Sequence, residues 1–386
     1  MSAPLAGIRV LEFAQIAAGP FFGCLFADLG ADVVKLERPD GGDGMRDWPP
    51  LLKGGDGETF SGNFASVNRN KRSISVDLKD PADLARLKEL ISTIDVFIEN
   101  YRPGVASRLG LGYDDLKRGN PRLVYCSITG YGQTGPYAQK GAFDVTVQAI
   151  SGVMSVTGEA DRPPVKCGVP IGDFSAGLYG AFVALAAVMH ARQTGQGTHI
   201  DCSMLGSLLG IAALQTSEFF GTNAAPRRLG SAHPRNAPYQ GFDASDRPFA
   251  VAAGNNKLWR DLCEIVGVPE LATDPRFQDQ SRRAKNQVEL ANILQPLFLK
   301  RTAKEWCRLL DDKGVPCAPV NDFPEILADE HVQHMDIVRE IVLPNGATTK
   351  TVAFPISIAG YDPEIRRPPP KLGEHNAEVF AEWMPR

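Results

Sequence analysis

The chain has 386 residues, of which 43% are hydrophobic and 22% charged, a balance typical of a soluble globular protein long enough for two domains. Its formal net charge of -4 lacks the basic excess that usually accompanies nucleic-acid binding, so we expect no nucleic-acid partner. Seven scattered cysteines without a C-x-x-C pair indicate neither a disulfide framework nor a zinc site, and they favour a cytoplasmic location.

The first 130 residues alternate between strand-like and helix-like segments, the pattern of an α/β protein. The strand-like segments are 7–13, 31–37, 73–78, 96–99 and 123–128, and the helix-like segments are 21–29 and 81–93. Strands joined by helical crossovers predict a mostly parallel, Rossmann-like open sheet, whose ligands bind at the carboxyl ends of the strands. We therefore expect a binding site where 37–39, 100–104 and 130–132 follow the strands.

A long apolar helix is predicted within the segment 163–204. The alternating run 165–171 predicts a strand that stops at Gly172 and Asp173, after which 178–189 are almost entirely apolar. The helix should end near Gly195 or Gly197, because glycine readily adopts the left-handed conformation of a helix C-cap. This apolar run is shorter than a membrane span, and no charged segment followed by an apolar one opens the sequence, so we expect neither a membrane partner nor an export signal.

Asp173 is predicted to lie where the strand-like run meets this helix. A carboxylate at that place can accept hydrogen bonds from the free N–H groups of the first turn, and the positive end of the helix dipole favours its ionised form. Two interpretations remain open at this point. Asp173 is either a carboxylate nucleophile or an N-cap with no other role.

After Leu205 the pattern changes to a connector and a smaller α+β domain. The predicted divisions are a large α/β domain over 1–205, a connector over 206–228, a small α+β domain over 229–325, and a connector with a C-terminal segment over 326–386. Within the second half, 249–253 predict a strand, Gly254–Asn256 the cap of a helix, and 280–312 charged helices. The run Pro344–Gly346 predicts a hairpin turn.

Several common catalytic motifs are missing from the sequence. The absence of G-x-x-x-x-G-K-[ST] argues against nucleotide hydrolysis, and the absence of H-E-x-x-H argues against zinc hydrolysis. The absence of G-x-S-x-G argues against serine hydrolysis. No G-x-G-x-x-G opens the first helix, which argues against ordinary dinucleotide redox chemistry. Gly130–Gly135 has the spacing of a glycine-rich loop, but it follows a late strand. His233 is the histidine most suited to a ligand site, with a structural hydrogen-bonding role as the alternative.

Taken in order, a set of short motifs resembles the family III CoA-transferases over essentially the whole chain. The motifs occupy 5–13, 18–20, 27–39, 70–79, 99–104 and 120–125 in the first half, and 233–234, 238–239, 254–255, 314–320 and 372–375 in the second. The resemblance implies transfer of coenzyme A (CoA) from an acyl-CoA to a free carboxylic acid, with CoA as a substrate and no permanently bound cofactor or metal. It also implies an interlocked-ring homodimer whose large domain is built from both ends of the chain.

The resemblance assigns Asp173, in a G-D-x-x-x-G segment, as the nucleophile that forms an aspartyl anhydride and then an aspartyl-CoA thioester. It points to backbone N–H groups of Ile16 and Ala17 as donors to the developing oxyanion. Some formyl-CoA transferases carry a glutamine where this chain has Ala17, whereas Gln15 lies two positions away. This departure argues against formate and oxalate as substrates.

The resemblance also implies a set of CoA contacts and supporting residues. The phosphates of CoA would be contacted by Arg38, Lys79 and Arg108. The adenine and pantetheine would be contacted by Val76, Asn100, Tyr101 and Leu109. The remainder of the CoA site would be formed by Gln15, Ile16, Ala17, Lys140 and Met204. Asp144 would orient Asp173, with Ala17 as a second supporting residue. For an acceptor with a second carboxylate, Arg72, Arg102 and Arg235 are all candidate cations, and spacing singles out none of them.

Two other functions are weighed against CoA transfer. An α-methylacyl-CoA racemase of the same superfamily uses a histidine and an aspartate as acid and base, and here Phe143 stands where that histidine would be. A non-catalytic CoA-binding protein could use the same scaffold, because a fold does not determine function. The missing histidine favours the transferase over the racemase, and the presence of Asp173 argues against a non-catalytic protein.

Overall fold

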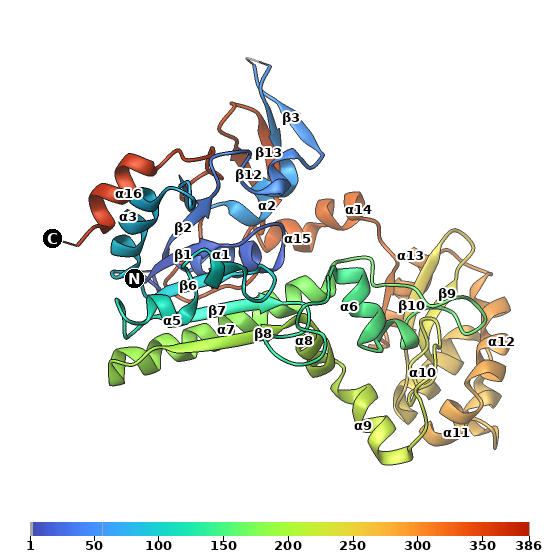
Figure 1. The fold of residues 1–386 in the computed structure, drawn as a ribbon. Coiled ribbons are helices and arrows are strands. Elements are labelled where there is room, and N and C mark those ends of the chain that lie inside the picture. The colour runs from blue at the N-terminus through green and yellow to red at the C-terminus, as the bar shows by residue number, and fades with distance from the viewer. Residues whose placement is uncertain (1–2, 56, 386) are drawn as a thin grey trace. The chain divides into compact units, whose positions relative to one another are not determined.

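The computed structural model describes residues 3–55 and 57–385 (Figure 1). The described chain divides into two compact units. The first comprises 3–153, 166–223 and 330–385, and the second comprises 154–165 and 224–329. The short segment 154–165, which the sequence pattern did not separate from the large domain, thus groups with the second unit.

A parallel six-stranded sheet forms the centre of the first unit. In spatial order it contains β5 (Lys71–Ser75), β2 (Asp32–Glu37), β1 (Arg9–Phe13), β6 (Val96–Glu99), β7 (Val124–Thr129) and β8 (Thr198–Ser203). The order of the strands therefore reverses between β1 and β6, as in Rossmann-like sheets. The mostly parallel α/β sheet predicted from the sequence is confirmed, although the polar edge strand β8 was missed.

Both faces of this sheet are covered by helices (Figure 1). One hydrophobic core joins the sheet to α1 (Ala18–Asp28), α7 (Ile171–Thr194) and α8 (Met204–Ile211), and another joins it to α3 (Pro81–Ile91) and α16 (Asn376–Trp383). Successive strand residues alternate between these cores, so Val10 belongs to the first and Leu11 to the second. Burial on both faces explains the apolar runs in strands such as β6, where Val96, Phe97 and Ile98 are all buried.

Helices α1 and α7 pack closely because α7 carries glycine at the contact. A Cβ added to Gly177 would lie 2.8 Å from the carbonyl oxygen of Ala18, and one added to Gly180 would lie 3.2 Å from a ring atom of Phe22. The helix ends as predicted at Gly195, with φ 75°. The helix spans 24 residues, so the expectation of an apolar run shorter than a membrane span is wrong. By length and hydropathy alone it could cross a membrane. In this structure its small residues pack into the core.

Shorter elements complete the first unit. They are the 3-10 turn η1 (Gly44–Asp47), β3 (Leu51–Lys53), β4 (Thr59–Ser61), α2 (Gly62–Asn68), α4 (Val105–Arg108), α5 (Tyr113–Leu116), α6 (Asp144–Ile150), α9 (Ala213–Thr222), α15 (Glu330–His334), β12 (Val338–Val342) and β13 (Thr348–Val352). The predicted turn around Gly346 is confirmed as the link between the antiparallel β12 and β13. The predicted connector 206–228 contains helical residues of α8 and α9.

The second unit has its own core, between a small antiparallel sheet and a group of helices. It contains β9 (Tyr239–Asp243), β10 (Pro248–Ala252), β11 (Cys317–Pro319), η3 (Pro269–Thr273), α10 (Asn256–Val266), α11 (Gln280–Lys285), α12 (Gln287–Phe298), α13 (Ala303–Asp311) and α14 (Phe323–Ala328), with η2 (Val153–Val156) at its border. Asn255 caps α10 as predicted, since its side chain accepts the N–H of Leu258. The predicted charged helices are also present.

Candidate active site

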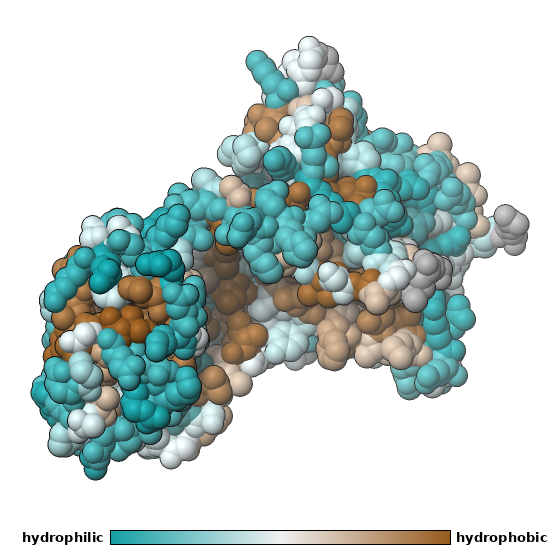
Figure 2. All heavy atoms as spheres, turned by 180° about the vertical axis from the view of Figure 1, so that it is seen from behind, coloured by the Kyte–Doolittle hydropathy of each residue, from teal (hydrophilic) through white to brown (hydrophobic). Residues whose placement is uncertain are grey.

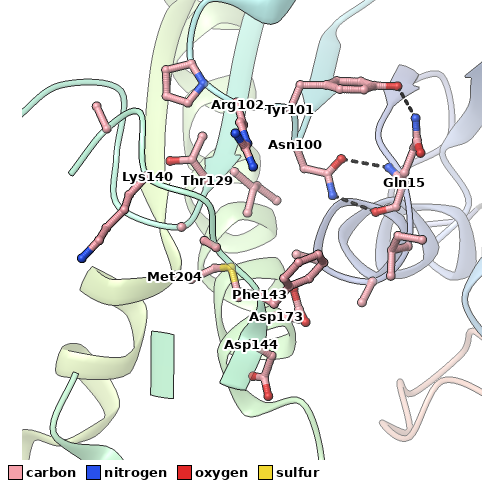
Figure 3. Close-up of a pocket in the computed structure, with 18 residues that line it drawn as sticks. Gln15, Asn100, Tyr101, Arg102, Thr129, Lys140, Phe143, Asp144, Asp173 and Met204 are labelled. Carbon is pink, nitrogen blue, oxygen red and sulfur yellow. Dashed lines mark hydrogen bonds between the residues drawn. The ribbon is translucent and has the colours of Figure 1, made fainter. Parts of the chain in front are cut away.

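A pocket of about 250 Å³ lies at the carboxyl edge of the six-stranded sheet. Its walls are the loops 15–18 and 100–103 after β1 and β6, the end of β7, the segment 138–144, and one residue each of α7 and α8 (Figure 3). It therefore lies at the point where the strand order reverses, which is the usual ligand site of an open parallel sheet.

Of the fourteen residues that the resemblance assigns to catalysis, its support or CoA binding, nine line this pocket. They are Gln15, Ile16, Ala17, Asn100, Tyr101, Lys140, Asp144, Asp173 and Met204. Thr129, the buried last residue of β7, also lines the pocket although it was not predicted, and Gly130 belongs to the loop 130–132 where a binding site was expected. Because the lining residues come from six separate stretches of the chain, the sheet topology is what brings them together.

The other five predicted residues are not among those that line the pocket. Arg38, Lys79 and Arg108 are exposed and follow β2, β5 and β6, so they lie along the same carboxyl edge of the sheet. Val76 and Leu109 pack in the core that contains α3, Val76 being fully enclosed by it. The guanidinium of Arg38 donates through Nε to the carbonyl oxygen of Gly42 at 3.2 Å.

Asp173 is the third residue of α7 and does not cap it. Pro170 occupies the N-cap position, and the preceding segment 165–171, expected as a strand, is irregular until the helix begins at Ile171. Within the described chain, the carboxylate of Asp173 accepts no hydrogen bond. The interpretation of Asp173 as an N-cap is therefore wrong, and its side chain is left to the pocket that it lines.

The carboxyl group of Asp173 is harder to ionise than the sequence suggested. Burial raises its pKa to about 6, and the nearby carboxylate of Asp144 adds to the increase. The helix dipole was expected to favour the charged form, but loss of hydration and a like charge outweigh it. Near neutral pH the group is mostly an ionised, poorly hydrated carboxylate, which is a suitable state for a nucleophile.

Asp144 ties the start of α7 to α6. Its Oδ1 accepts the N–H of Gly172 at 2.8 Å, and its Oδ2 accepts Nε2 of Gln148 at 2.7 Å. Gln148 is fully buried, and its Oε1 accepts the N–H of Cys167 at 2.8 Å. This network holds the residue next to Asp173 in place. Gln148 was not predicted from the sequence, although its position four residues after Asp144 places both side chains on one face of a helix.

The loop after β1 contains an unusual backbone conformation. Ile16 has φ 65°, which is strained for a β-branched residue. Its N–H donates to the two carboxylate oxygens of Asp43 at 3.1 and 3.2 Å. The side chain of Asn100 holds Gln15 through both backbone groups, donating to the carbonyl at 2.7 Å and accepting the N–H at 2.9 Å (Figure 3). The loop is therefore held from two sides.

Buried charged side chains on the strands of the sheet stabilise this loop. Nζ of Lys35 lies 3.0 Å from Oε1 of Glu12 and 2.9 Å from Oδ2 of Asp43, and it donates to the carbonyl of Ala14 at 2.8 Å. Burial by itself would lower the pKa of Lys35, but the two carboxylates outweigh burial and raise it. Lys71 lies 2.7 Å from the other oxygen of Glu12. Loss of one charge here would leave another buried and unpaired.

Two backbone N–H groups remain available beside Asp173. Ala17 and Ala18 line the pocket at the start of α1, and their N–H groups donate to no acceptor in the part of the chain that the structure describes. Ile16, which the resemblance had suggested as a donor, is unsuitable because its N–H is bound to Asp43. The positive end of the helix dipole of α1 adds to the attraction for a negative oxygen.

Among the described residues, no group of three metal-binding side chains is placed to hold a metal ion, and no histidine lines the pocket. The family model of CoA-transferase family III matches residues 5–376. The chain belongs to this family. As a family III CoA-transferase it is an enzyme that exchanges CoA between acyl-CoA and carboxylic acids.

Similar proteins cover the chain almost completely. It is 40% identical over 381 residues to a succinate–glutarate CoA-transferase of Agrobacterium fabrum, an alignment that covers 98% of this chain and 95% of that protein. It is 37% identical over 381 residues to a succinyl-CoA:glutarate CoA-transferase of Homo sapiens, covering 99% and 86%. The crystal structure of a CAIB/BAIF family protein from Brucella suis has a TM-score of 0.88 at 36% identity and covers 99% of this chain and 100% of that one.

Proposed function

We propose that this CoA-transferase works through covalent intermediates on Asp173, with a small carboxylic acid as acceptor. The observation that carries the proposal is the poorly hydrated carboxylate of Asp173, which accepts no hydrogen bond within the described chain and lines the same pocket as Ala17 and Ala18. The relatives named above act by name on succinate and glutarate. Small organic acids of that kind are therefore the first acceptors to test.

The proposed reaction needs four steps and no net proton transfer. The Asp173 carboxylate attacks the donor thioester carbonyl, the C–S bond breaks, and CoA thiolate leaves an aspartyl anhydride. The thiolate then attacks the aspartyl carbonyl and displaces the donor acid as a carboxylate, which leaves an aspartyl-CoA thioester. The acceptor carboxylate attacks this thioester, and the thiolate finally attacks the acceptor carbonyl of the new anhydride, which regenerates Asp173.

Each attack places negative charge on a carbonyl oxygen. The unpaired N–H groups of Ala17 and Ala18 are the proposed donors to that oxygen, since they lie at the first turn of α1 in the pocket wall. The loop that presents them is held by Asp43 and Asn100, so little reorganisation is needed during the reaction.

The pocket is too small for a whole CoA molecule, so we place most of CoA along the carboxyl edge of the sheet. Three exposed cations follow strands β2, β5 and β6 at this edge, namely Arg38, Lys79 and Arg108. Each can bind a phosphate group. Lys140 is exposed at the pocket rim and is a further candidate. No permanently bound cofactor is needed for the proposed chemistry.

An exposed apolar face on the first unit supports the proposed homodimer. On α7, Leu178, Phe182 and Met189 are 54%, 72% and 59% exposed, and on α9 Phe220 is 80% exposed. Figure 2 shows hydrophobic residues exposed in several places on the face that it draws. An apolar hollow of about 630 Å³ borders α7. Surfaces of this kind usually bind another chain; a monomer in analytical ultracentrifugation would contradict the proposal.

The racemase alternative lacks an acid–base pair in this pocket. Phe143 is 80% exposed at the pocket wall, where that enzyme would need an imidazole, and none of the described lining residues is a histidine. The non-catalytic alternative gives no reason for a buried carboxylate with a pKa of about 6 beside unpaired N–H groups.

Trapping of the intermediate tests the proposed mechanism. The full-length enzyme is incubated with an acyl-CoA and then treated with hydroxylamine or borohydride, and peptides are analysed by mass spectrometry. Modification is expected at Asp173 alone, and Asp173→Asn should give none. In parallel, a branched acyl-CoA is incubated in deuterium oxide. Rapid exchange of its α-hydrogen with no adduct at Asp173 would instead support the racemase.

A further inference from the structure

Among the described residues that line the pocket, two carry a positive charge, Arg102 and Lys140. The ammonium of Lys140 lies 4.5 Å from the ring centre of Tyr137, and in Figure 3 it points away from the other labelled side chains. The guanidinium of Arg102 points instead into the space between Thr129 and Asn100. Arg102 is therefore the cation that can contact a small molecule inside the pocket.

The guanidinium of Arg102 has no protein partner within the described chain. No hydrogen bond or ion pair reaches it, and the residue takes part only through its backbone, whose carbonyl accepts the N–H of Val105. Gly141 makes room for it, since a Cβ at that position would lie 3.0 Å from Nη2. Arginine carries five N–H donors in a planar fork that fits a carboxylate. An unpaired guanidinium in a pocket wall is thus suited to bind an anion.

The two other arginines suggested by the sequence do not fit this role. Arg72 is buried, and its guanidinium is bound by Asp32, Glu378 and Glu382 at 2.5 to 2.8 Å. Arg235 belongs to the second unit and is not among the residues that line the pocket. The structure therefore separates three candidates that were equivalent in sequence.

The size of the pocket limits the ligand. A volume of about 250 Å³ is enough for a short dicarboxylic acid and too small for a whole CoA molecule. One carboxylate of such an acid must reach Asp173 to react, and Arg102 offers a partner for the other in the same pocket. A second negative charge without a cation would be repelled by Asp144, whereas Asp173 is uncharged as the aspartyl-CoA thioester that the acceptor attacks.

We propose that Arg102 recognises the second carboxylate of the acceptor, so that this enzyme selects short dicarboxylic acids over monocarboxylic acids of the same length. The inference rests on the proposed function, because it places the reacting carboxylate at Asp173. Arg102 acts on specificity and takes no part in the covalent steps.

The test compares matched acids in the wild-type enzyme and in Arg102→Gln. With one acyl-CoA donor, kcat/KM is measured for succinate, for its monoamide succinamate, and for butyrate. In the wild type, succinate should exceed the two neutral-ended acids by about 10- to 100-fold. In Arg102→Gln that advantage should disappear because kcat/KM falls for succinate alone. Arg102→Lys should keep part of the advantage. Because Arg102 is exposed, we expect these variants to fold.

A different pattern would overturn the inference. If Arg102→Gln lowers kcat/KM equally for all three acids and weakens CoA binding in calorimetry, Arg102 binds CoA phosphate. If the wild type uses butyrate as well as succinate, the enzyme does not select dicarboxylic acids, while the proposed function still stands. If the wild type transfers CoA to no acid and no adduct forms at Asp173, the proposed function itself fails.

Discussion

The carboxylate of Asp43 accepts the backbone N–H of Ile16, whose φ of 65° is unusual for a β-branched residue. The same carboxylate lies 2.9 Å from Nζ of the fully buried Lys35. One side chain therefore joins the strained loop of the active site to the charged interior of the sheet. Strain of this kind persists only where surrounding contacts enforce it.

Asp43→Asn should weaken both the loop and the core. We expect unfolding free energy to fall by about 3 kcal/mol, because Lys35 loses a buried charge partner. We also expect kcat to fall about tenfold with a smaller change in KM for CoA, because the oxyanion donors of the loop shift. Urea unfolding and steady-state kinetics measure the two effects. Asp47→Asn, an exposed change four residues away, should alter stability by no more than about 0.5 kcal/mol.

Asp173→Asn should abolish CoA transfer and stabilise the fold above pH 6. The folded-state pKa of Asp173 is raised to about 6 from an ordinary 3.8, so its ionisation costs stability as the pH rises through that interval. The full shift corresponds to about 3 kcal/mol, and partial exposure reduces our expectation to about 1–2 kcal/mol. Urea unfolding at pH values above 6 and below 3.8 measures the gain, which should vanish at the lower pH.

Asp83→Asn provides the matched control, because Asp83 is also the third residue of a helix, α3, and faces solvent in part. Its loss should destabilise by about 0.3–1 kcal/mol through the helix dipole. An equal stabilisation by both variants would show that burial of Asp173 is not the cause.

The first half-reaction should depend on an ionised Asp173. Single-turnover formation of the covalent adduct needs no acceptor acid, so its rate reports the enzyme groups alone. We expect the rate constant to decline tenfold per pH unit below an apparent pKa of about 6. Rapid-quench kinetics across this range measure it. A rate that stays constant down to pH 4 would contradict the raised pKa.

Asp144→Asn should move the decline in the rate of adduct formation to lower pH. Asp144 is the second cause of the raised pKa of Asp173, after burial, so removal of its charge should lower the apparent pKa by up to about one unit. The rate at the plateau should also fall, because Nε2 of Gln148 loses its carboxylate acceptor beside Gly172. The same rapid-quench series gives both values. An unchanged apparent pKa would mean that the two carboxylates do not interact.

Gly177→Ala should destabilise the enzyme although alanine favours helices. Its new Cβ would lie 2.8 Å from the carbonyl oxygen of Ala18, so α1 and α7 must separate at a cost of about 1–3 kcal/mol. Gly221→Ala, in α9 with no atom within 4 Å of its added Cβ, should instead stabilise by about 0.5–1 kcal/mol. Thermal unfolding of the pair measures the difference. Equal effects would show that α1 and α7 are not tightly packed.

Much of the sheet was predictable because its strands are short apolar runs between helix-like segments, a local pattern. β8 was missed because Thr198–Ser203 is polar and forms an edge. The strand expected over 165–171 does not form, since Gly172 and Cys167 are bound by the side chains of Asp144 and Gln148. Those bonds span 19 and 28 residues, beyond the reach of a local pattern.

The sequence by itself determined the α/β class, the family and the candidate nucleophile Asp173, because each depends on short motifs and their order along the chain. Only the tertiary structure decided which residues share the pocket, that Asp173 is buried with a raised pKa, and that Ile16 is held by Asp43. It also distinguished Arg102 from Arg72 by showing which guanidinium is already paired. Burial, charge pairing and backbone strain arise from contacts between distant segments, so local sequence cannot specify them.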